Sequence, residues 1–143
     1  MMIKSILLPL APLQAFELFT VRVSDWWPTE NRHTNDPLST LHMLDSGRFF
    51  ERASDGREIE LGRIVAWDEG RRLLFDFYVA TGPDRPTQVE VQFEAEVEGT
   101  RVTVSHGPMP RSAELWGERA PRYARAWERV LAALKDAAAP QAR

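Results

Sequence analysis

The stretch that decides the fold is residues 87–106, which read TQVEVQFEAEVEGTRVTVSH. Apolar and polar residues alternate on both sides of Glu98-Gly99, a pair typical of a turn. One face carries Val89, Val91 and Phe93 before the turn, and Val102, Val104 and His106 after it. The pattern predicts two antiparallel strands with one buried and one solvated face.

The same alternation extends upstream from this pair. It predicts further strands over residues 2–8, 41–45, 48–53, 58–67 and 73–79, separated by turns rich in Asp, Ser and Gly. Gly62 lies inside one of these strands and indicates a bulge or a strong bend. A short helix is predicted to begin near Pro12, and Trp27-Pro28 is predicted to end a second short helical turn.

Downstream of the strands, one long amphipathic helix is predicted over residues 112–139. Its apolar stripe recurs every three or four residues and consists of Trp116, Ala120, Tyr123, Trp127, Val130, Leu131 and Leu134. Pro121 is expected to divide it into a short helix ending near Arg119 and a longer one. An α+β arrangement in which the sheet curls around this helix buries both apolar surfaces and leaves room for a cavity.

Composition restricts the classes of function. The chain has 143 residues, which predicts one domain spanning residues 1–143. A net charge of −3 and a pI near 5.6 argue against nucleic-acid or anionic-membrane partners, and no segment is apolar enough for a membrane span, so a cytoplasmic protein is expected. Cysteine is absent, and His33, His42 and His106 lack metal-ligand spacing; neither a metal nor a cofactor is predicted.

Several motifs occur in an order that resembles a known family. They are Trp26-Trp27-Pro28, GRFFE at 47–51, GRIVAW at 62–67, TQVEVQF at 87–93, GTRVTVSH at 99–106, and a final helix with Tyr123 and Trp127. Together they resemble the SRPBCC (START/birch-pollen-allergen-like) superfamily, and within it the activator of heat-shock-protein-90 ATPase homologue family. The resemblance implies a helix-grip fold. In that fold a curved antiparallel sheet of six or seven strands wraps around the long C-terminal helix, with two short helices near the N-terminus.

Two titratable residues are candidates for catalysis. His106 lies on the apolar face of its strand, where it could act as a general base or orient a ligand; the alternative is a core histidine bonded to a carbonyl or an aromatic partner. Glu51 shares a face with Phe49, which would place a carboxylate inside and near His106. The alternative for Glu51 is a bulge that turns it to the rim, beside an arginine.

Large aromatic side chains are the candidates for ligand binding. The predicted set is Trp27, Phe49, Trp67, Phe77, Trp116, Tyr123 and Trp127. Such residues either line a pocket or simply fill the core. The arginines at 119, 122, 125 and 129 have the spacing of a solvated helix face, which could also frame a cavity mouth attractive to carboxylates.

Three functions are compatible with these features. The first is binding of a small hydrophobic or amphipathic ligand between the sheet and the C-terminal helix. The second is an enzyme of the cyclase, dehydratase or hydrolase type that uses His106 with Glu51. The third, implied by the resemblance, is a co-chaperone-like regulator of a chaperone ATPase, docking through the acidic outer face formed by Glu90, Glu94 and Glu96. A monomer or a homodimer is expected.

Overall fold

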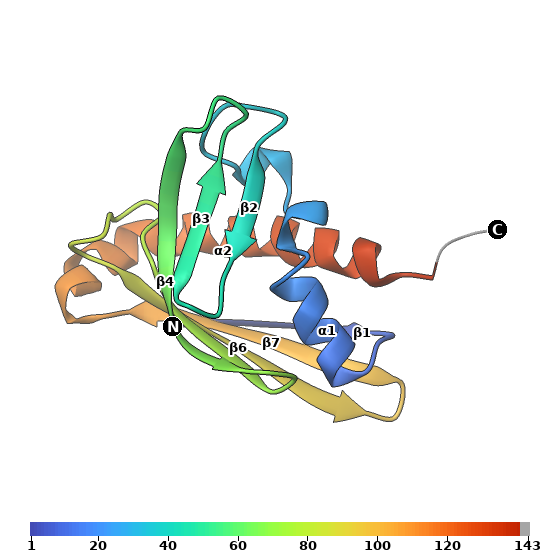
Figure 1. Ribbon diagram of the computed structural model, residues 1–143. Coiled ribbons are helices and arrows are strands. Elements are labelled where there is room, and N and C mark those ends of the chain that lie inside the picture. The colour runs from blue at the N-terminus through green and yellow to red at the C-terminus, as the bar shows by residue number, and fades with distance from the viewer. Residues whose placement is uncertain (141–143) are drawn as a thin grey trace.

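The computed structural model describes residues 1–140, over which the chain forms seven strands, two α-helices and three short 3₁₀ turns (Figure 1). The strands are β1 (Met2–Leu8), β2 (Thr40–Met43), β3 (Arg48–Arg52), β4 (Glu58–Asp68), β5 (Arg72–Phe77), β6 (Thr87–Glu96) and β7 (Gly99–Pro108). The helices are α1 (Pro12–Phe19) and α2 (Ala113–Ala138), and the 3₁₀ turns are η1 (Val23–Asp25), η2 (Thr29–Asn31) and η3 (Pro110–Ser112).

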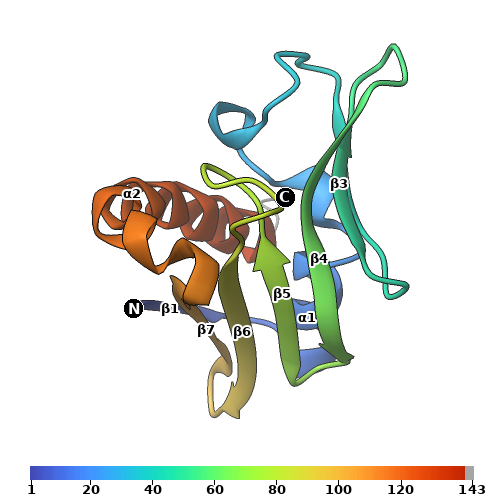
Figure 2. The ribbon, with the colours of Figure 1, turned by 90° about the vertical axis from the view of Figure 1, so that its left-hand side faces the viewer.

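All seven strands belong to one antiparallel sheet. Their order is β1-β7-β6-β5-β4-β3-β2, so β2 to β7 pair in sequence order and β1 closes onto the last strand. The sheet curves, and α2 lies along its concave side (Figure 2). The predicted α+β helix-grip architecture is therefore confirmed, with seven strands.

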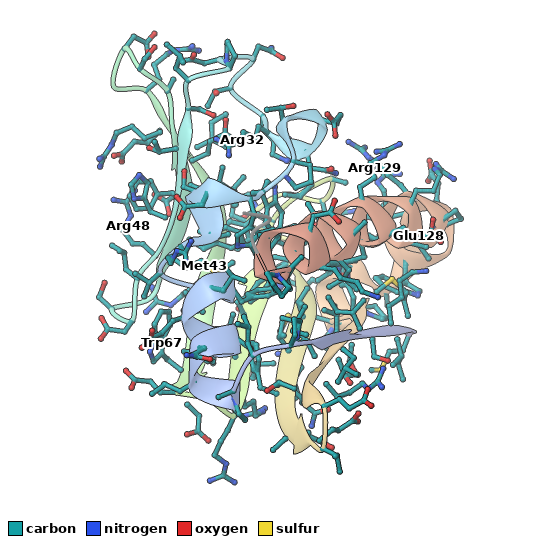
Figure 3. All side chains as sticks on the ribbon, turned by 90° about the vertical axis from the view of Figure 1, so that its right-hand side faces the viewer. Arg32, Met43, Arg48, Trp67, Glu128 and Arg129 are labelled. Carbon is teal, nitrogen blue, oxygen red and sulfur yellow. The ribbon has the colours of Figure 1, made fainter. Side chains whose placement is uncertain are left out.

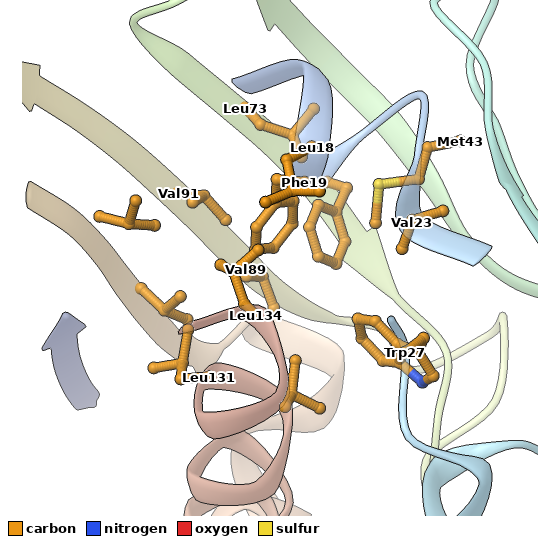
Figure 4. Packing of buried hydrophobic residues seen from close by; sticks show 14 of the residues in the cluster. Leu18, Phe19, Val23, Trp27, Met43, Leu73, Val89, Val91, Leu131 and Leu134 are labelled. Carbon is orange, nitrogen blue, oxygen red and sulfur yellow. The ribbon is translucent and has the colours of Figure 1, made fainter. Parts of the chain in front are cut away.

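The predicted alternation in the β6–β7 pair is seen directly in burial. Val89, Val91 and Phe93 are buried, and Gln88, Glu90 and Gln92, which alternate with them, are only partly buried. The two strands pair in the register Val91↔Val104 and Glu96↔Gly99. Figure 4 shows Val89 and Val91 of this sheet face beside Leu131 and Leu134 of α2. Burial of each large apolar side chain contributes roughly 1.5–3 kcal/mol, so this face fixes the position of the helix.

One prediction about the C-terminal helix is wrong. Pro121 does not divide it, because α2 runs without interruption from Ala113 to Ala138 with Pro121 inside it. A proline inside a helix removes the hydrogen bond to the carbonyl four residues earlier, here that of Gly117, and its ring crowds that carbonyl, at a cost of about 3 kcal/mol. Pro121 is exposed, so water can solvate that carbonyl, while Tyr123 and Trp127 are buried in the core and hold the helix in place.

The irregularity predicted at Gly62 is present in β4. The pairing shifts from Phe49↔Gly62 to Phe50↔Glu60, which leaves Leu61 as the extra residue of a bulge. A Cβ atom on Gly62 would collide with the carbonyl oxygen of Asp76 on the adjacent strand. Glycine is therefore required here by the close approach of two backbones.

Across residues 1–140, none of the helices combines the length and the apolar character needed to cross a bilayer.

Candidate functional site

A cavity of about 380 Å³ lies between α2, the end of β5 and residues 29–38, which contain η2 and are called the η2 segment. Its apolar wall consists of Trp27, Phe77, Val79, Tyr123, Ala126, Trp127 and Val130. Its polar rim consists of Glu30, Asn31, His33, Arg122, Arg125 and Arg129. The cavity thus has an apolar wall and a charged mouth, an arrangement suited to a molecule with two chemically different ends.

Aromatic rings from three separate parts of the chain meet at this wall. The rings of Trp27 and Trp127 are edge to face with centroids 6.2 Å apart, and Phe77 lies 6.4 Å from Tyr123. Phe49 supports them from behind, since its ring contacts both Trp27 and Phe77 at about 6 Å. Four of the seven aromatic residues predicted to bind a ligand line the cavity, and Phe49 packs directly against two of them.

The other two predicted aromatic residues lie elsewhere. Trp116 stacks on Tyr123 with centroids 5.7 Å apart and meets the ring of His106 at 5.2 Å, so it forms a layer next to the cavity wall. Trp67 instead packs against Phe16 of α1 and lines a separate hollow of about 350 Å³ beside that helix. The structure therefore does not bring Trp67 together with the other six.

His106 points inward from β7, as its place in the alternation predicts, and it is fully buried. Its Nδ1 accepts a hydrogen bond from the Trp127 indole N–H at 3.0 Å, which requires the proton of the neutral ring to be on Nε2. That Nε2 then donates to the Thr87 hydroxyl at 2.8 Å, and this hydroxyl donates in turn toward the Phe77 carbonyl. Burial lowers the pKa of His106 to about 3, so the ring is neutral across the physiological range.

Glu51 also points inward, and its hydrogen-bond partners belong to the η2 segment. The carboxylate accepts hydrogen bonds from the backbone N–H groups of His33 at 2.7 Å and Thr34 at 3.0 Å, and from the Thr34 hydroxyl at 2.5 Å. Burial acts to raise the pKa of Glu51, but these hydrogen bonds outweigh it and hold the pKa below its ordinary value. Of the two alternatives left open by the sequence, the inward one holds, and Glu51 anchors the segment that forms one rim of the cavity.

Within residues 1–140, His106 and Glu51 have no hydrogen-bond partner in common, and neither is among the residues that line the cavity. Both ring nitrogens of His106 are engaged by protein groups, which matches the reading of a core histidine. Their catalytic pairing stays a prediction.

The rim residues of the η2 segment carry no periodic pattern, and no element is predicted over residues 29–38 from the sequence. Arg32 fixes this segment by donating to the carbonyl oxygens of Trp27, Ser24 and Ser39. These contacts link residues that have no periodic pattern, so no local signal could have revealed them. Val130 belongs to the apolar stripe predicted for the C-terminal helix. Ala126 was detectable in principle, because it lies three residues after Tyr123 and four before Val130.

Comparisons with known proteins agree with this architecture. A family model described as "Activator of Hsp90 ATPase homolog 1-like protein" matches residues 11–139. No match was found among curated proteins.

Solved structures also share the fold. The solution structure of CalC, a self-sacrificing resistance protein from Micromonospora echinospora, has a TM-score of 0.71 at 24% identity, covering 94% of this chain and 91% of that one. Protein CV1439 from Chromobacterium violaceum has a TM-score of 0.62 at 14% identity, covering 98% of both chains. Protein NE0264 from Nitrosomonas europaea has a TM-score of 0.62 at 12% identity, covering 94% of this chain and 91% of that one. At these identities the likeness concerns the fold alone.

Proposed function

Since this chain belongs to the family of Activator of Hsp90 ATPase homolog 1-like proteins over residues 11–139, we propose that it binds a small hydrophobic or amphipathic molecule between α2 and the sheet. The observation that carries the proposal is the cavity of about 380 Å³ walled by Trp27, Phe77, Tyr123 and Trp127. A volume of this size falls within the roughly 300–1,000 Å³ typical of small-molecule sites.

One polar atom beside the cavity supports the same proposal. The side-chain oxygen of Asn31 is buried and has no hydrogen-bond partner among residues 1–140. A buried acceptor without a donor costs about 1–3 kcal/mol. A hydroxyl or N–H group of a bound molecule would offset that cost.

A chaperone partner is a second candidate, and it rests on the description of the family. The acidic outer face that would dock is partly neutralised within the chain itself. Glu90 pairs with Arg72 at 2.5 Å and Glu96 with Arg101 at 3.1 Å, which leaves Glu94 as the unpaired member of the three within residues 1–140. This pairing weakens the case for an acidic docking surface, so ligand binding ranks first.

Native mass spectrometry of the freshly purified protein tests the proposal. We expect an added mass in the native spectrum that disappears on denaturation. Ala126 lines the cavity from the helix side, so the variant Ala126→Phe should fill the space and lose the added mass while remaining folded. A bare mass in the native spectrum, together with no thermal stabilisation by any of a panel of apolar and amphipathic compounds, would contradict ligand binding.

A further inference from the structure

The cavity mouth concentrates positive charge on one side of α2. Arg122, Arg125 and Arg129 are spaced three and four residues apart, so they follow one face of the helix, and all three line the cavity. Figure 3 shows Arg129 on the side of α2 that faces the segment around η2. Among the described residues 1–140, Glu30 is the one carboxylate in the lining, so arginines outnumber carboxylates there by three to one.

These arginines differ from most others in the molecule. Ion pairs elsewhere involve Arg22, Arg48, Arg52, Arg57, Arg71, Arg72, Arg101 and Arg119. Arg122, Arg125 and Arg129 form no salt bridge with any side chain of residues 1–140, although Glu128 is adjacent in sequence; Glu128 instead pairs with Lys4 at 3.1 Å. The guanidinium groups at the mouth therefore have their bidentate donors unengaged by the carboxylates of residues 1–140.

The remaining rim groups do not cancel this charge. Burial, together with the positive charge of Arg122, lowers the pKa of His33 despite the nearby Glu51 carboxylate. The Glu51 carboxylate is occupied by the backbone of the η2 segment. An excess of positive charge thus remains beside the aromatic wall.

We propose that the cavity selects amphipathic anions, with an aromatic or polycyclic body against Trp27, Phe77 and Trp127 and a carboxylate, sulfonate or phosphate head held by Arg122, Arg125 and Arg129. This inference rests on the proposed ligand-binding function and adds the chemistry of the head group. The apolar wall supplies affinity through burial, and the arginines supply the discrimination between charged and neutral ligands.

A matched pair of fluorescent probes separates the two contributions. The anionic probe is 8-anilinonaphthalene-1-sulfonate, and the neutral probe is N-phenyl-1-naphthylamine, which has the same rings and N–H but no sulfonate. We expect the anionic probe to bind the wild-type protein about tenfold more tightly, since hydrogen bonds between charged groups are the stronger ones. Its affinity should fall with added salt while that of the neutral probe does not, because the head group lies at an exposed rim.

Variants at the mouth complete the test. Arg122→Gln, Arg125→Gln and Arg129→Gln should each weaken the anionic probe about threefold or more and leave the neutral probe unchanged. The matched control is Arg63→Gln, which removes the same charge from an exposed arginine of β4 that forms no ion pair within the described part of the chain; it should change the affinity of neither probe.

The outcomes distinguish the two proposals. Equal affinity for both probes, or an anionic preference that survives all three mouth variants, would overturn the selection of anions and leave ligand binding standing. Binding of neither probe to the folded protein would overturn both proposals together.

Discussion

At the scale of single residues, His106 is held neutral by what surrounds it. It is fully buried, accepts a hydrogen bond from Trp127, donates one to Thr87 and has no carboxylate partner among residues 1–140. Its pKa of about 3 means that protonation would place an uncompensated charge in the core. The residue therefore contributes to stability only while it is neutral.

This gives a pH dependence with a definite sign. An unfolded histidine takes up a proton near pH 6.5, whereas folded His106 does so only near pH 3. Between these values the unfolded state binds more protons, so stability falls as the pH falls. We expect His106→Gln to have a lower free energy of unfolding than wild type at pH 7. Because only wild type loses stability through His106 as the pH falls, this difference should shrink by about 1.4 kcal/mol per pH unit below pH 6.5.

Urea unfolding at pH 7 and pH 5 measures this change. The control is His42→Gln, because His42 is a partly exposed residue of β2, whereas His106 is fully buried. The difference in unfolding free energy between wild type and His42→Gln should therefore change less between pH 7 and pH 5. A stability difference between wild type and His106→Gln that stays constant from pH 7 to pH 5 would show that His106 titrates normally in the folded protein.

At the scale of elements, two glycines illustrate opposite requirements. Gly117 lies inside α2, its φ is not positive, and a Cβ atom there would meet no other atom within 4 Å. Gly62 lies in β4, where a Cβ atom would collide with the Asp76 carbonyl oxygen. We expect Gly117→Ala to raise the free energy of unfolding by about 0.5–1 kcal/mol, because alanine loses less backbone freedom on helix formation.

Gly62→Ala is the matched substitution with the opposite sign. It forces two hydrogen-bonded strands apart at the bulge, and we expect a loss of about 2 kcal/mol or more from overpacking. Thermal and urea unfolding of the two variants beside wild type measures both effects. A destabilised Gly117→Ala would mean that the helix bends at Pro121 in a way that needs glycine four residues earlier.

How far the elements could be predicted depends on the range of the interactions that form them. The β6–β7 pair and the stripe of α2 could be predicted because their periodicity is local and their apolar faces have one place to be buried. The uninterrupted course of α2 through Pro121 could not, because packing of Tyr123 and Trp127 overrides the local preference. The rim formed by residues 30–33 could not either, because Arg32 and Glu51 hold it by contacts between distant parts of the chain.

At the scale of the whole molecule, the cavity is formed jointly by three parts of the chain. β5 supplies Phe77, α2 supplies Tyr123 and Trp127, and the η2 segment supplies the opposite rim. The apolar core holds β5 and α2 in place. The η2 segment has few buried apolar side chains, so its position depends on hydrogen bonds made by Glu51 and Arg32. The η2 segment is therefore the wall whose order depends on polar contacts.

Glu51→Gln tests this dependence. The Glu51 carboxylate accepts from three donors, whereas the neutral amide of glutamine has one acceptor oxygen and one NH₂ group that would face those donors. We therefore expect the free energy of unfolding to fall by about 1–3 kcal/mol at pH 7 and hydrogen exchange to quicken at the His33 and Thr34 amides. Because the folded pKa of Glu51 lies below its ordinary 4.5, this contribution is present above pH 4.5 and is lost as the pH falls through the folded value.

The control is Glu94→Gln, an exposed carboxylate of β6 without an ion pair among residues 1–140. If exchange at His33 and Thr34 were unchanged in Glu51→Gln, the core alone would position the rim. If it quickened and the affinity of the neutral probe fell with it, the buried carboxylate would be a positioning residue for the ligand cavity.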